Sequence, residues 1–76
     1  MAEHLLDATG LKCPIPVLRA RKAMKPLAIG DVLEIHATDP SALMDFKNFC
    51  ETTGHELVSS QEREDEVLIL RVKKNS

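Results

Sequence analysis

The sequence predicts a single α+β domain, a two-layer α/β sandwich in which two helices cover one face of a four-stranded mixed sheet. The chain has 76 residues, which is the size of one small domain covering residues 1–76. Hydrophobic residues make up 43% of it and charged residues 29%, a globular composition that argues against disorder. Strand-like and helix-like apolar patterns follow one another in the order β-α-β-α-β-β.

The first strand and the first helix flank a short turn. Residues 3–8 predict a strand, and Gly10 gives the turn after it the backbone freedom that it needs. A helical pattern then extends to about Lys25, and Pro26 and Gly30 mark its end. Its apolar residues recur at helical spacings and form one face, which consists of Val17, Ala20, Met24 and Leu27.

The second strand and the second helix follow the same plan. Residues 31–38 alternate between apolar and polar side chains, which is typical of a strand with one buried face. We expect Asp39 to be the N-cap of the next helix and Pro40 to take its first helical position. Gly54 is well suited to the position just beyond the C-terminal end of this helix. The apolar stripe of this helix consists of Leu43, Phe46, Phe49 and Cys50.

Two more strands complete the sheet. Residues 55–61 and 67–73 predict strands, and the acidic run 62–66 between them predicts a hairpin turn. This last pair must be antiparallel, whereas the two crossovers that contain helices join parallel strands. The sheet face away from the helices is open, and Val67 and Ile69 on it are either isolated surface residues or part of a partner surface.

The composition excludes several classes of protein. With two Phe and no Tyr or Trp, nucleic-acid binding by aromatic stacking is ruled out. The start of the chain lacks the basic and apolar regions of a signal peptide, and no segment is apolar enough to span a membrane. Two cysteines are too few for a secreted disulfide framework, so we expect a cytoplasmic protein with reduced thiols.

Cys13 is the strongest candidate for a reactive residue. It directly precedes the first helix, where free N–H groups and the helix dipole favour a thiolate and lower a cysteine's pKa. Pro14 and Pro16 make this lead-in stiff and non-helical. The residues alone leave open a second interpretation, in which Cys13 is an inert cysteine packed in a loop.

The surroundings of Cys13 in the sequence limit its chemistry. The segment has no second cysteine for local dithiol exchange and no evident base nearby. Such a thiolate suits carrying a group, for example the outer sulfur of a persulfide, better than hydrolysing a bond. Cys50 is expected to be an inert core cysteine, although a resolving or disulfide-bonded thiol is the alternative and would need Cα atoms within about 7 Å.

Charge and metal-ligand patterns add weaker expectations. Residues 11–25 carry five basic residues and no acid, so that Lys12, Arg19 and Lys22 could steer an acidic partner toward Cys13; the alternative is an ordinary solvated helix face. Direct nucleic-acid binding by this short helix is not expected. No metal site or cofactor is expected either, because the histidines fit no zinc spacing. They are His4, His36 and His55.

Residues 7–18 (DATGLKCPIPVL) closely resemble the signature of the TusA/SirA-like (YedF-like) sulfur carrier proteins. The motif of this family is Cys-Pro-x-Pro at the start of the first helix, preceded by a Gly-Leu step. The resemblance continues at Lys22, at residues 30–31, at residues 37–40 with residues 45–46, and at residues 54–57, so it covers nearly the whole chain. The β-α-β-α-β-β sandwich of the family agrees with the element order predicted above.

The resemblance implies that Cys13 accepts sulfane sulfur as a persulfide and relays it, with Gly10, Pro14 and Pro16 setting the geometry. It implies a cysteine desulfurase or rhodanese-type donor and a downstream acceptor protein. We expect a monomeric carrier that is a co-substrate rather than an enzyme. Ile15 stands where some members carry an acidic residue, so tRNA thiolation and other sulfur pathways all stay open. The alternative function is a redox-sensing regulatory or protein-interaction module that uses Cys13.

Overall fold

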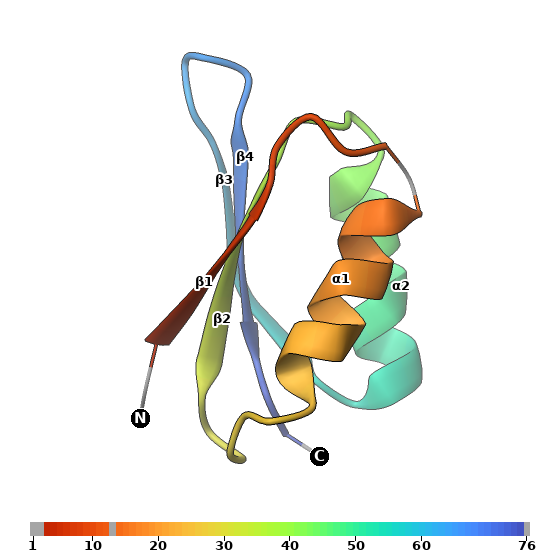
Figure 1. Cartoon of the computed structure of the whole chain (residues 1–76), viewed down its shortest axis with the longest axis vertical. Coiled ribbons are helices and arrows are strands. Elements are labelled where there is room, and N and C mark those ends of the chain that lie inside the picture. Colours follow the sequence, from red (N-terminus) through yellow and green to blue (C-terminus); the bar gives the residue numbers. More distant parts are fainter. Residues whose placement is uncertain (1–2, 13, 76) are drawn as a thin grey trace.

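The computed structural model of the protein describes residues 3–12 and 14–75, and it has the predicted element order. The two helices lie side by side on one face of a four-stranded sheet, which confirms the two-layer sandwich (Figure 1). Within the described residues, neither helix has the length and apolar character needed to cross a bilayer. The elements are β1 (Glu3–Ala8), α1 (Ile15–Met24), β2 (Val32–Ala37), α2 (Ala42–Thr53), β3 (Glu56–Glu62) and β4 (Leu68–Lys73).

The sheet has the strand order β1-β2-β4-β3. β1 pairs with β2 in parallel, and β4 pairs antiparallel with both β2 and β3. β2 and β3 therefore run in the same direction with β4 between them. This confirms that each helix-containing crossover joins parallel strands and that the final hairpin is antiparallel.

The core lies between the sheet and the two helices. Leu33, Ile35 and Ala37 alternate along β2 and are buried on the helix side, as their period of two predicts. Phe46 of α2 is fully buried and meets Phe49 edge to face, with ring centroids 6.1 Å apart. Full burial of a large apolar side chain contributes about 1.5–3 kcal/mol, so these residues supply much of the stability of this small domain.

The start of α2 differs from the prediction. Asp39 is not the N-cap and Pro40 is not the first helical residue; α2 begins at Ala42 with Ser41 as its N-cap. The Asp39 carboxylate accepts hydrogen bonds from the N–H and the hydroxyl of Ser41, at 2.8 and 2.7 Å. It therefore stabilises a turn that ends two residues later, and Pro40 lies inside that turn.

The last hairpin also differs in detail. Val67, expected on the open face of the last strand, lies just before β4 and is buried, whereas Ile69 is half-buried. The Arg63 N–H donates to the Val67 carbonyl at 2.8 Å and closes the hairpin across the acidic run. Glu66, in this turn, has a φ of +66°, in the left-handed region that glycine favours. Gly54 ends α2 in a left-handed conformation, as predicted.

The C-terminal end of α1 is held by a residue far away in the sequence. The Nζ of Lys74 donates to the carbonyl oxygens of Met24, Lys25 and Leu27 at 2.9, 3.2 and 2.7 Å. The last carbonyls of a helix have no partner inside it and carry its negative dipole end, so a lysine there is favourable. Lys74 thus fixes α1 to the segment that follows β4.

Candidate functional site

The candidate site is the loop between β1 and α1, together with the start of α1. Cys13 itself lies outside the described residues, so the structure defines the site through the residues on either side. The Lys12 carbonyl accepts a hydrogen bond from the Ile15 N–H at 2.8 Å, which joins the two flanks of Cys13. Lys12, Pro14 and Ile15 are all exposed, so both flanks lie at the surface.

The two prolines have different roles. Pro14 is at the N-cap position of α1, where no side chain makes a capping hydrogen bond. Pro16 is in the first turn of α1 and is one of the largest fully buried side chains. Beyond fixing its own φ, Pro16 therefore anchors the start of α1 in the core, and this holds the helix end nearest Cys13 in place.

Gly10 lies in a tight turn three residues before Cys13. The Leu11 N–H donates to the Ala8 carbonyl at 3.3 Å, and Gly10 has a φ of +78°, as predicted from its role in the turn. The Asp7 carboxylate accepts hydrogen bonds from the N–H and the hydroxyl of Thr9, at 3.0 and 2.7 Å. These two bonds hold the pKa of Asp7 below its usual value, so it stays ionised and keeps the turn intact at neutral pH.

A residue from a different loop also reaches this turn. The hydroxyl of Thr38, which directly follows β2, accepts a hydrogen bond from the Gly10 N–H at 2.9 Å. An open depression of about 430 Å³ lies between the two loops and is lined by residues 10–12 and 38–40. A second depression of about 410 Å³ shares residues 38–40 with it and extends to the β3–β4 hairpin. The site is therefore a shallow surface, as expected for a domain of this size.

The basic residues of the predicted site are spread along α1. Arg19 and Lys22 are exposed, and Lys22 belongs to the last turn of the helix. At 1.5 Å per residue, Lys22 lies about 10 Å along the axis from Ile15, too far to act directly on a thiolate at the helix start. Arg21 instead packs over the ring of Phe49, 5.9 Å from its centroid.

Cys50 is buried in α2, on the apolar face that contains Phe46 and Phe49. Burial raises the pKa of its thiol, which keeps it protonated and a poor nucleophile. This is the environment of a core cysteine, the interpretation that we favoured from the sequence.

Comparison with known proteins identifies the family of this chain. The sequence profile described as "Sulfurtransferase TusA" matches residues 4–74. The chain belongs to the TusA family. It is 53% identical over 57 residues to the sulfur carrier protein TusA of Pseudomonas entomophila, which covers 75% of this chain and 71% of that one. It is 49% identical over 57 residues to the sulfur carrier protein TusA of Allochromatium vinosum, covering 75% of each.

A solved structure gives the same family relationship. The crystal structure of a SirA-like protein from Desulfitobacterium hafniense superposes with a TM-score of 0.83 at 26% sequence identity, and the match covers 95% of this chain and 97% of that one. The named TusA relatives are sulfur carrier proteins, which supports a sulfur carrier role for this member of the TusA family.

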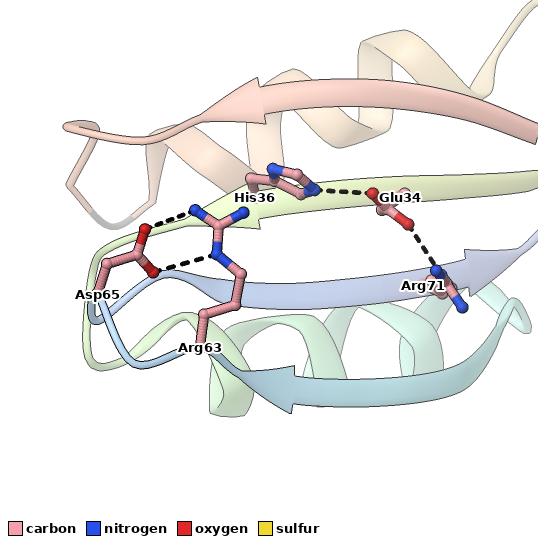
Figure 2. Close-up of polar contacts among 5 residues, drawn as sticks. All are labelled: Glu34, His36, Arg63, Asp65 and Arg71. Carbon is pink, nitrogen blue, oxygen red and sulfur yellow. Dashed lines mark hydrogen bonds and ion pairs between the residues drawn. The ribbon is translucent and has the colours of Figure 1, made fainter.

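The open face of the sheet in this TusA-family member holds a polar network remote from α1. The Glu34 carboxylate binds the His36 ring at 2.7 Å and the Arg71 guanidinium at 2.9 Å (Figure 2). These two contacts, His36 first, hold the pKa of Glu34 below its usual value. Nearby, Arg63 and Asp65 pair within the hairpin (Figure 2).

The three histidines lie in separate places. His4 contacts Asp31, His36 contacts Glu34, and His55 packs against Phe49, with ring centroids 5.8 Å apart. Among residues 3–12 and 14–75, no three potential ligands from His, Cys, Asp and Glu come together in a way that could hold a metal ion.

Proposed function

We propose that this chain is a sulfur carrier in which Cys13 holds the transferred sulfur as a persulfide. The observation that carries the proposal is that the TusA profile spans residues 4–74, so the Cys-Pro-x-Pro segment falls inside the matched region. Lys12 and Pro14, on either side of Cys13, are both exposed just before α1, where a larger protein can reach them.

The proposed chemistry needs no oxidant or cofactor. The Cys13 thiolate attacks the outer sulfur of a persulfide on the donor enzyme, and a new S–S bond forms to Cys13. The donor's own S–S bond breaks, and its cysteine leaves as a thiolate with the bonding electron pair. In the second step an acceptor thiolate attacks the outer sulfur on Cys13, which regenerates the Cys13 thiolate.

The geometry supports a carrier better than an independent enzyme. The depression beside this loop and the neighbouring one, between residues 38–40 and the β3–β4 hairpin, are both open to solvent, so neither encloses a substrate or excludes water. A carrier needs an exposed thiol and a firm surface around it, while the enzymes that load and unload it supply the remaining catalytic groups. We therefore propose that the protein is a co-substrate of sulfurtransferases.

The proposed partners are a cysteine desulfurase or a rhodanese-type enzyme as donor and a downstream protein as acceptor. Lys12, Arg19 and Lys22 are exposed and can attract an acidic surface on either of them. We expect the carrier to be monomeric and to act in the cytoplasm, where thiols are kept reduced. The final use of the sulfur, in tRNA thiolation or in another pathway, depends on the acceptor.

Intact-mass measurement tests the proposal. The protein is incubated with a cysteine desulfurase and cysteine, and separately with a rhodanese and thiosulfate. We expect a mass gain of one sulfur atom that a reductant reverses and that is absent in Cys13→Ser. If no competent donor changes the mass of the wild-type protein, the proposal is wrong.

The redox-sensor alternative is tested with Cys50→Ser. A sensor that forms a Cys13–Cys50 bond loses its response in this variant, whereas a carrier still accepts sulfur. The burial of Cys50 weighs against the sensor, because a resolving thiol must be accessible and partly ionised.

A further inference from the structure

The turn of residues 8–11, before Cys13, is of one defined type, which is set by the orientation of its central peptide group. The Ala8–Leu11 hydrogen bond, the φ of +78° at Gly10 and the absence of a positive φ at Thr9 identify a type II turn. Types I and II differ by a flip of the central peptide, here the one between Thr9 and Gly10. The direction of the Gly10 N–H therefore reports which form the turn takes.

Thr38 binds this same N–H. Its hydroxyl oxygen accepts from Gly10 at 2.9 Å, across 28 positions of the sequence. The fold brings the two residues together because β1 and β2 are parallel neighbours that end in register, with Ala8 opposite Ala37. The loops after these strands consequently leave the sheet side by side, at the end where α1 begins (Figure 1).

From this contact we infer that Thr38 is a positioning residue for Cys13, an inference that rests on the proposed role of Cys13 in sulfur transfer. By holding the Thr9–Gly10 peptide in its type II orientation, Thr38 sets the direction in which the chain enters the Lys12–Pro14 segment. Thr38 touches no reacting atom, and it acts through Gly10.

The contact fits a positioning role better than a purely stabilising one. Thr38 and Gly10 are both exposed, so water can satisfy the Gly10 N–H if the hydroxyl is removed. The free energy of unfolding should then change little, while the turn gains access to its other form. Among the described residues, an added Cβ at Gly10 would meet no atom within 4 Å, so we expect alanine there to disturb mainly the backbone conformation.

The test is the pH profile of Cys13 alkylation by iodoacetamide, read by intact mass, in wild type, Thr38→Val, Thr38→Ser and Gly10→Ala. We expect Thr38→Val to slow alkylation at neutral pH by about 2- to 10-fold, the factor that corresponds to one neutral hydrogen bond. The apparent pKa of the thiol should move toward that of a free cysteine, about 8.5. Thr38→Ser keeps the hydroxyl and should match the wild type, and Gly10→Ala should resemble Thr38→Val.

The control is Thr52→Val, at another exposed threonine, which removes a hydroxyl that donates a partly buried hydrogen bond to the Phe49 carbonyl at 3.2 Å near the end of α2. It should leave the profile unchanged. The inference is overturned if Thr38→Val titrates like the wild type, or if Thr38→Ser is altered as much as Thr38→Val. Because alkylation needs no sulfur donor, the profile can support positioning even if sulfur loading fails, so the two proposals fail separately.

Discussion

Replacing Lys74 with methionine tests whether the end of α1 depends on the lysine that follows β4. Methionine keeps most of the length of the side chain and removes the ammonium group, which donates to three carbonyl oxygens at 2.7–3.2 Å. The three bonds share one charge at a helix C-terminus. A favourable charge at such a site contributes up to about 2 kcal/mol when it is partly buried, and Lys74 is half-buried. We therefore expect Lys74→Met to lower the free energy of unfolding by about 1–2 kcal/mol.

That loss is large for a domain of this size. At roughly 0.05–0.15 kcal/mol per residue, a chain of 76 residues has a total stability of about 4–11 kcal/mol. For a domain of 60–100 residues, each kcal/mol lowers the melting temperature by about 4–8 °C. Urea unfolding followed by circular dichroism gives the free energy, and a thermal scan gives the shift in melting temperature.

The matched control is Lys73→Met, at the neighbouring position. Val72 is buried on the helix side of the sheet, so Lys73, the next residue of β4, faces the open side. This change should alter the free energy of unfolding by less than about 0.5 kcal/mol, the usual limit for surface substitutions. If Lys74→Met destabilises the protein no more than Lys73→Met, the three carbonyl contacts do not hold α1 and the reasoning fails.

Three further predictions follow from single side chains. Burial, and then the charge of Lys74, lower the pKa of His55 in the folded protein, so the unfolded chain binds a proton more readily. The free energy of unfolding should therefore fall as the pH drops from about 7.5 to about 5.5. In His55→Gln this fall should be smaller. Cys50→Ser buries a hydroxyl and should cost about 1–3 kcal/mol while sulfur loading persists, and a folded variant that fails to load would contradict the carrier mechanism. Glu66→Gly relieves the positive φ and should stabilise the protein by about 0.5 kcal/mol in urea unfolding, whereas Glu64→Gly in the same turn should not.

The elements that the sequence predicted well are those that depend on short-range periodicity. Strand β2 alternates so regularly that its buried face follows from the sequence alone, and α2 is defined by its apolar stripe. The errors lie at the junctions between elements. The Asp39 side chain can bond two or three residues ahead, and only the folded backbone shows that it bonds to Ser41.

The candidate site shows the same division. The turn at Gly10 could be predicted because the freedom of glycine to take a positive φ acts locally. The two prolines were expected to keep the lead-in non-helical, but α1 begins at Ile15, between them. Thr38 could not be predicted, because its contact with Gly10 spans 28 positions and exists only once β1 and β2 pair in register. A signal was nevertheless present: two predicted parallel strands must end at the same edge of the sheet, which brings the residues after them together.

The sheet order also has a consequence for the way in which the protein is made. β4 follows β1, β2 and β3 in the chain and is synthesised after them, yet it lies between β2 and β3 and pairs with both. Within the described part of the chain, β3 has no other strand to pair with. While residues 68–73 are still inside the ribosome, the nascent chain can form at most the β1–β2 pair and its helices. The turn that leads to Cys13 can form early, but the sheet that supports it is complete only when β4 has emerged.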